Sequence, residues 1–239
     1  MSSPRTPRPS PWPIPCFAHQ GYWKTLPEKS TIRAFTRAVE ARAPGIELDV
    51  RVVEGELKVG HDRKHALRRV APTLAQALSA IARTARRVGV KRPVVNVELK
   101  ERGTARMVLR VLRDAARQGW RTTDFIVSAF TRVKTDPERR QNLPAELAIV
   151  AAESRLPLAV LVRSASGIDR HIAQARTLRA CSLHLKRTDL TSRYVARAHA
   201  AGLTVYAWTA RSQRQAARVS ATGADGYFAD LCRFEGIER

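Results

Sequence analysis

Two acidic side chains share one face of a short predicted strand. The run Gly45-Ile46-Glu47-Leu48-Asp49-Val50 alternates, so a β-strand here places its apolar residues on one face and Glu47 and Asp49 on the other. Strands are depleted in Asp and Glu, and neighbouring carboxylates repel each other unless a cation joins them. The pattern therefore indicates a metal site, although an exposed edge strand with a solvated polar face gives the same alternation.

The same pattern recurs in a second predicted strand, over residues 93–100, where Glu98 and Lys100 lie on the polar face. Two histidines accompany these strands, because His19 follows the first predicted strand and His61 follows the strand that returns from the acidic one. Carboxylate oxygens suit a hard cation such as Mg²⁺ or Ca²⁺, which leaves the imidazoles free to carry protons. The residue types thus predict metal-assisted acid/base chemistry.

The elements that must position these residues alternate strictly between strand and helix. Such alternation requires parallel strands joined by crossover helices, and eight units in about 220 residues are the number that closes a TIM barrel. The carboxyl ends of all strands then meet at one mouth, together with Trp208 at the end of the seventh strand. A six-stranded doubly wound sheet is the alternative. The predicted strands cover residues 14–18, 45–53, 93–100, 124–128, 158–163, 182–186, 204–209 and 226–230.

The chain of 239 residues carries 43 Lys or Arg against 21 Asp or Glu, a formal net charge of +22. This charge attracts phosphates, nucleic acids and anionic membranes alike, and a general excess of Arg on Ala-rich helices explains it equally well. Aromatic residues make up only 6% and no RNA-binding motif occurs, which argues against nucleic acid. The basic run 63–92 holds nine Lys or Arg and no acid, so it is either a solvated face or a surface for peripheral contact with an anionic membrane.

Cysteine usage and the termini bear on location. Cys16, Cys181 and Cys232 are odd in number and far apart, which argues against disulfides or a zinc site and for a reducing compartment. Residues 1–13 carry five Pro and two Arg with no apolar run of a signal peptide, so we expect a disordered tail before one barrel domain at 14–239. No run reaches the roughly 20 apolar residues of a spanning helix. We therefore expect a cytoplasmic protein.

A series of short motifs from about residue 14 to 231 resembles, in order, the motifs of glycerophosphodiester phosphodiesterases. The resemblance implies a metal-dependent TIM-barrel hydrolase that cuts a small-molecule glycerophosphodiester into glycerol 3-phosphate and an alcohol. The motifs are His19-Gln20-Gly21, Pro27-Glu28, Gly45-Ile46-Glu47-Leu48-Asp49-Val50, His61-Asp62, Pro72-Thr73-Leu74, Val97-Glu98-Leu99-Lys100, Ser128-Ala129-Phe130, Val205-Tyr206-Ala207-Trp208-Thr209 and Gly223-Ala224-Asp225-Gly226.

The resemblance also implies a role for each candidate residue. Three carboxylates would hold one divalent cation, Mg²⁺ or Ca²⁺, and two imidazoles would be the acid/base pair. Lys100 would face the phosphate, and Trp208 would form part of the apolar wall around the glycerol or head group. The carboxylates are those of Glu47, Asp49 and Glu98, and the imidazoles are those of His19 and His61.

Two departures from the family pattern concern substrate binding. The family usually has Arg directly after the first His, where it grips the phosphate. Here Gln20 is the substrate-binding candidate instead, and it can donate one hydrogen bond but adds no charge. The usual Pro-Glu-Asn-Thr becomes Pro27-Glu28-Lys29-Ser30-Thr31, so Glu28 is a substrate-binding candidate and Lys29 is a candidate for the missing positive charge.

Two other functions use the same residues. Lysophospholipase D or sphingomyelinase D activity needs the same metal and histidines with a longer apolar groove, whereas a non-catalytic phosphate or nucleic-acid binder would keep the barrel and lose turnover. Gln20 and the net charge of +22 motivate the second of these, whereas the low aromatic content and the lack of an RNA-binding motif argue against it. The remaining histidines are expected on the surface or in the core; they are His65, His171, His184 and His199.

Overall fold

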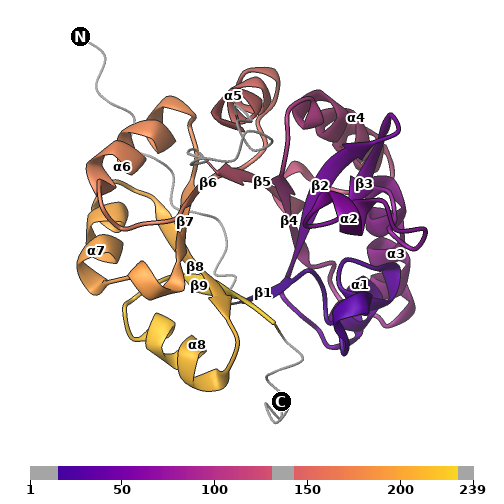
Figure 1. Ribbon diagram of the computed structural model, residues 1–239, viewed down its shortest axis with the longest axis horizontal. Helices are drawn as coiled ribbons and strands as arrows, with labels where there is room; N and C mark the ends of the chain where they lie inside the picture. The colour runs from indigo at the N-terminus through magenta and orange to yellow at the C-terminus, as the bar shows by residue number, and fades with distance from the viewer. Residues whose placement is uncertain (1–15, 131–142, 231–239) are drawn as a thin grey trace.

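Eight parallel strands form a closed barrel with helices around its outside (Figure 1). The computed structural model describes residues 16–130 and 143–230. Neighbouring strands follow the order β1-β9-β8-β7-β6-β5-β4-β2, and pairing of β1 with β2 closes the ring. This confirms the predicted TIM barrel and excludes the open doubly wound sheet. The barrel strands are β1 (Cys16–His19), β2 (Gly45–Val53), β4 (Val94–Leu99), β5 (Phe125–Phe130), β6 (Leu158–Val162), β7 (Ser182–Lys186), β8 (Thr204–Ala210) and β9 (Gly226–Ala229).

Several of the helices begin where a short polar side chain caps the first turn. Thr31, Thr191 and Ser212 each accept a hydrogen bond from the backbone N–H three residues later, and Thr73 forms a reciprocal capping box with Gln76. None of the described helices is long and apolar enough to cross a membrane. The helices are α1 (Ile32–Glu40), α2 (Arg63–Ala66), α3 (Leu74–Arg87), α4 (Thr104–Arg117), α5 (Leu143–Glu153), α6 (Ile168–Thr177), α7 (Ser192–Ala200) and α8 (Gln213–Ser220), with 3₁₀ turns at η1 (Leu26–Glu28), η2 (Thr122–Asp124) and η4 (Arg187–Asp189).

The strand predicted to return from the acidic one is confirmed as β3 (Glu56–Val59), which pairs antiparallel with β2 outside the ring. Helix α2, which the sequence pattern does not predict, follows shortly after it. Helix α2 spans a single turn, too short for a periodic pattern, and begins because Asp62 accepts a hydrogen bond from the backbone N–H of His65 at 2.8 Å. The predicted tail at 1–13 and the residue Cys232 lie outside the described residues.

The alternation of β2 and β4 divides their side chains between two layers. Ile46, Leu48 and Val50 are buried in the layer between barrel and helices, so the intervening polar side chains point into the barrel. The lower interior is filled by aromatic rings, with Phe17 stacked on Phe228 at a centroid distance of 4.9 Å. The aromatic rings therefore fill one layer of the barrel interior, and the polar side chains of β2 and β4 in the next layer surround a pocket.

Candidate active site

Three buried carboxylates meet on two neighbouring strands. Glu47 and Asp49 lie on β2 and Glu98 on β4, and the register pairs Asp49 with Glu98 and Glu47 with Asn96. One oxygen from each carboxylate lies within 4.8 Å of the corresponding oxygens of the other two. The parallel pairing of β2 with β4 thus brings together the three acids that sequence spacing indicated.

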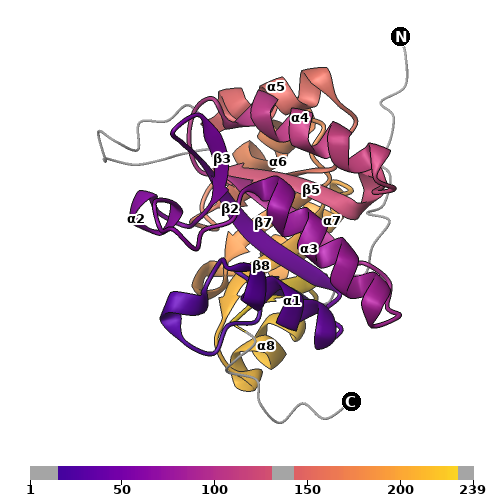
Figure 2. The same cartoon turned by 90° about the vertical axis from the view of Figure 1, so that its right-hand side faces the viewer.

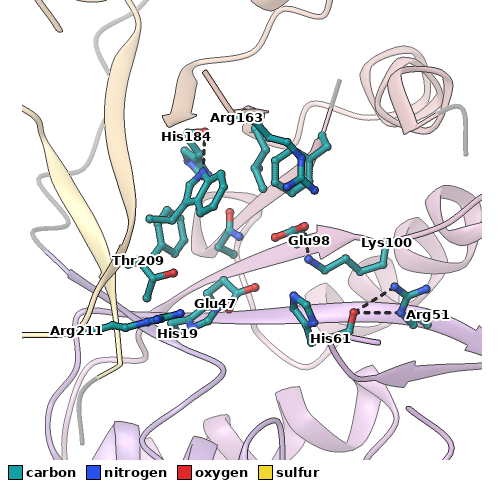
Figure 3. A pocket seen from close by; sticks show the side chains of 15 residues that line it. His19, Glu47, Arg51, His61, Glu98, Lys100, Arg163, His184, Thr209 and Arg211 are labelled. Carbon is teal, nitrogen blue, oxygen red and sulfur yellow. Dashed lines mark hydrogen bonds and ion pairs between the residues drawn. The ribbon is translucent and has the colours of Figure 1, made fainter. Parts of the chain in front are cut away.

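Lys100 is the cation nearest to these acids. Its Nζ lies 2.8 Å from Asp49 Oδ1. It also forms an ion pair with Glu98 Oε1, which Figure 3 shows. Burial alone would lower the pKa of Lys100, but the charges of Asp49 and Glu98 raise it above its ordinary value. Lys100 is therefore an ammonium that offsets part of the negative charge.

The remaining negative charge is uneven among the three acids. Burial and the charges of Asp49 and Glu98 raise the pKa of Glu47 well above its ordinary value. Burial, followed by the charge of Asp49, also raises the pKa of Glu98 despite Lys100. For Asp49, burial is outweighed by the charges of Lys100 and the nearby imidazoles, and its pKa falls to about 2. Glu47 and Glu98 thus lack enough nearby positive charge to stabilise their ionised forms.

Glu47 shows most directly that these residues fit a cation. Its Oε2 accepts a hydrogen bond from the backbone N–H of Gln20 at 3.0 Å, whereas its Oε1 is buried with no hydrogen-bond partner among the described residues. An unpaired buried carboxylate oxygen is costly unless something binds it. Carboxylate oxygens are the ligands that Mg²⁺ and Ca²⁺ prefer, so the set of Glu47, Asp49 and Glu98 fits a hard divalent ion.

His19 lies beside this cluster and is oriented by an acid at the far end of the chain. Its Nδ1 is 2.8 Å from Asp230 Oδ1, and its Nε2 is 4.0 Å from Glu47 Oε2. Burial alone would raise the pKa of Asp230, but the hydrogen bond and charge of His19 bring it below its ordinary value. With Asp230 ionised, His19 Nδ1 donates the hydrogen bond and Nε2 is left to exchange a proton.

We expect Asp230→Asn to lower kcat by roughly tenfold to 100-fold with little change in KM, because the imidazole of His19 loses its charged partner. A matched control lies at the other end of β9, where His199 Nε2 is 2.8 Å from Asp225 Oδ2 on the outer surface. Asp225→Asn should leave both constants within about twofold of wild type. Equal losses in the two variants would contradict the role given to Asp230.

His61 lies near the pocket mouth, and an arginine holds its backbone. The Nε and Nη2 atoms of Arg51 donate to the carbonyl oxygen of His61 at 3.3 and 3.1 Å, while Nη1 binds Glu101 at 2.9 Å. Partial burial of its imidazole lowers the pKa of His61 below its ordinary value, and the charge of Asp49 opposes this shift. The residue as a whole is exposed. His19 and His61 appear on either side of Glu47 in Figure 3, and all three line one pocket.

The two residues at the departures from the family pattern lie outside this pocket lining. Gln20 has a positive φ of 59° and is buried, and its Nε2 donates to Asp49 Oδ2 at 3.1 Å. Glu28 accepts hydrogen bonds from the backbone N–H of Lys24 at 2.8 Å and from Arg37 at 2.7 Å. The structure therefore gives Gln20 contact with a carboxylate and Glu28 contact with the loop before α1.

The far side of the pocket is apolar. Trp208 lines it, donates from its indole N–H to the His184 carbonyl at 3.0 Å, and packs edge-on against Phe130 at a centroid distance of 5.7 Å. The cavity has a volume of about 350 Å³, and Arg163 and Arg211 also border it. It therefore combines an acidic wall, an apolar wall and several cations.

Several lining residues were not among the sequence candidates. Most of them point into the barrel from the ends of strands, so the alternation of side chains along a strand could have identified them. Their position on a strand does not, however, distinguish a residue that lines a pocket from one that packs in the core. His184 is completely buried, in agreement with the prediction of a surface or core position, and it also lines the pocket. The additional lining residues are Arg51, Asn96, Phe130, Leu161, Arg163, His184, Thr209, Arg211 and Phe228.

Solved structures with the same fold include several phosphodiesterases. A phosphodiesterase from Oleispira antarctica, in complex with the product sn-glycerol-3-phosphate, aligns with a TM-score of 0.71 at 17% identity over 92% of this chain and 94% of that one. A glycerophosphodiester phosphodiesterase from Parabacteroides distasonis gives 0.69 at 20% identity over 94% of each chain. One from Thermotoga maritima gives 0.62 at 20% identity, over 92% of this chain and 96% of that one. At these identities the likeness shows the fold.

The family follows from a sequence comparison. No curated protein matched the chain. The model of the glycerophosphoryl diester phosphodiesterase family matches residues 55–232, a span that includes His61, Glu98, Lys100 and Trp208 and begins after Glu47 and Asp49. This match confirms the resemblance inferred from the ordered motifs. The chain belongs to the glycerophosphoryl diester phosphodiesterase family and is an enzyme of the phosphoric diester hydrolase class.

Proposed function

We propose that the protein hydrolyses a glycerophosphodiester to glycerol 3-phosphate and an alcohol, with one divalent cation and two histidines as its catalytic groups. The observation that carries this proposal is the grouping of three carboxylates, one with a buried unpaired oxygen, of which Glu47 and Glu98 line one pocket together with His19 and His61. Family membership supports the reaction class. The Oleispira structure supports the product class, because that protein holds sn-glycerol-3-phosphate.

Each group in the pocket has a place in this reaction. A divalent cation held by Glu47, Asp49 and Glu98 would neutralise the phosphate oxygens. One imidazole removes a proton from the attacking hydroxyl, and the other protonates the departing alkoxide. The attacker expected from the family resemblance is the glycerol hydroxyl of the substrate, which gives a cyclic phosphate that water then opens.

The remaining proposed roles concern binding. Lys100, which lines the pocket as an ammonium, would contact the phosphate when substrate is bound. Trp208 would contact the glycerol or the head group through its ring. Gln20 would support binding indirectly, because its side chain holds Asp49. Glu28 would order the loop that follows His19, through its contacts with Lys24 and Arg37.

A lipid substrate is the second candidate. It is favoured by the apolar wall formed by Phe130, Leu161 and Trp208, which suits an acyl chain or other apolar group beside the phosphate. Comparison of glycerophosphocholine with lysophosphatidylcholine at equal concentration separates the two candidates. We further propose a cytoplasmic location, which is supported by the free thiols of Cys16 and Cys181.

The test measures release of glycerol 3-phosphate from glycerophosphocholine in Mg²⁺, in Ca²⁺ and in EDTA. We expect turnover with at least one of the two ions and a loss of at least about 100-fold in EDTA, since the carboxylates alone would repel the phosphate. Addition of excess ion should restore the rate. Full activity in EDTA would contradict the metal, and no release from any glycerophosphodiester would contradict the substrate class.

A further inference from the structure

Large apolar side chains are exposed in only two segments of the described structure. Leu26, Leu67 and Val70 are 64%, 55% and 63% exposed, and no other large apolar side chain in residues 16–130 and 144–230 is comparably exposed. Single exposed apolar residues are common and need no explanation. The grouping needs one, because an exposed apolar cluster is typical of a surface that binds something.

The two segments touch each other and are firmly attached. Arg68, next to Leu67, donates from its guanidinium to the carbonyl oxygen of Pro27, next to Leu26, at 3.2 Å. Ala66 is buried, and a Cβ placed on Gly60 would come within 2.6 Å of the Ala66 backbone, so the chain around α2 packs closely against the end of β3. The apolar side chains are therefore held outward by a fixed backbone.

Positive charge surrounds these apolar side chains. Residues 24–33 and 61–70, which we call the basic rim, contain seven Lys or Arg and two acids. Glu28 pairs with Arg37 and, at 3.7 Å, with the rim cation Arg33, and Asp62 pairs with His65. The seven cations are Lys24, Lys29, Arg33, Arg63, Lys64, Arg68 and Arg69.

The basic rim lies at the end of the barrel where the active-site pocket opens. It follows His19 on one side and begins with His61 on the other, and both histidines line the pocket. In Figure 2, α2 and the indigo loop before α1 project from the side of the barrel toward which β2 runs. A flat anionic surface that contacts the rim would therefore face the pocket mouth.

We propose that the basic rim docks on an anionic lipid bilayer, with Leu26, Leu67 and Val70 entering the interface and the cations contacting the head groups. Apolar side chains encircled by Lys and Arg match the composition of peripheral membrane surfaces. A nucleic acid would use the cations but leave the aliphatic side chains without apolar partners. The proposal concerns where the protein binds and does not depend on the reaction.

Sedimentation of the full chain with vesicles tests the proposal. We expect binding to phosphatidylcholine vesicles that contain phosphatidylglycerol, weak binding to pure phosphatidylcholine, and a marked loss at high salt. The triple variant Leu26→Ser, Leu67→Ser, Val70→Ser keeps the charge and should bind at least about tenfold more weakly. Thermal unfolding should be close to wild type, because these side chains are exposed.

A matched charge control separates the rim from the net charge of the whole protein. Arg63→Ser, Lys64→Ser, Arg69→Ser removes three rim cations, and Arg86→Ser, Arg110→Ser, Arg113→Ser removes three exposed cations from α3 and α4. The rim variant should lose at least about tenfold in vesicle binding and the helix variant less than about threefold. The proposal would be overturned if the rim variant and the helix variant lost vesicle binding equally, or if the apolar variant bound vesicles as wild type does. It would also be overturned if the apolar variant lost binding to duplex RNA as much as binding to vesicles.

Discussion

Replacing either His19 or His61 by Ala is expected to lower kcat/KM for a glycerophosphodiester by about 10³-fold. A positioned general acid or base contributes roughly 10²- to 10⁴-fold, and the proposed reaction uses one imidazole for each proton transfer. Both side chains line the pocket beside the carboxylates, and His19 is held by Asp230 at 2.8 Å. The measurement is the release of glycerol 3-phosphate at saturating divalent ion.

The control for this prediction is a histidine that also pairs with an acid but lies elsewhere. His199 contacts Asp225 on the outer surface and does not line the pocket, so His199→Ala should retain near wild-type turnover. If His61→Ala were fully active, His61 would have no catalytic role, and a different group would have to move that proton. Unchanged thermal unfolding of both variants would show that lost activity reflects chemistry rather than folding.

Glu47→Gln is expected to abolish the effect of divalent ions on thermal unfolding while making the metal-free protein more stable. The pKa of Glu47 is raised by burial and by Asp49 and Glu98, so folding favours its protonated form. That contribution is present at low pH and is lost as the pH rises through the raised pKa, leaving a buried charge near neutral pH. Gln mimics the protonated form, and its amide N–H can donate to the neighbouring carboxylates.

Thermal unfolding in EDTA and in excess Mg²⁺ or Ca²⁺ checks this prediction. Wild type should gain stability from the ion, whereas Glu47→Gln should gain little, lose at least about 100-fold in activity and melt a few degrees higher in EDTA. Glu146 supplies a control, because it is a buried carboxylate that accepts hydrogen bonds from Gly103 and Ala105 outside the pocket. Glu146→Gln should lose stability in both conditions and keep the ion-dependent gain. An ion-dependent gain in Glu47→Gln equal to that of wild type would contradict the proposed site.

Local sequence determined the barrel and the grouping of its acids. A strand turns successive side chains to opposite faces, so the spacing of Glu47 and Asp49 already placed both on one side. The alternation of strand and helix then required parallel pairing, which brings the matching face of the next strand alongside. These are short-range properties of the backbone, and for this reason Glu98 could be assigned to the same pocket before the structure.

The side-chain contacts of residues in the loops after β1 and β3 depended on loop conformations that the residue pattern does not specify. Gln20 occupies the position of the family's phosphate-binding Arg, and only the structure shows that its backbone has a positive φ of 59° and that its side chain donates to Asp49. Helix α2 is one turn long, and the exposed Leu67 directly after it forms part of an apolar surface only because the loop that carries exposed Leu26 lies beside it. Such arrangements follow from how loops pack on a finished barrel.

The longest-range contacts were decided by tertiary structure alone. Asp230 lies 211 residues from His19, and the two meet only because closing the barrel places β9 next to β1. Arg51 and the His61 carbonyl, by contrast, meet through the local hairpin of β2 and β3. Sequence periodicity therefore determined which strands and acids form the pocket, whereas barrel closure decided which acid orients His19, since that contact depends on distances between segments far apart in the chain.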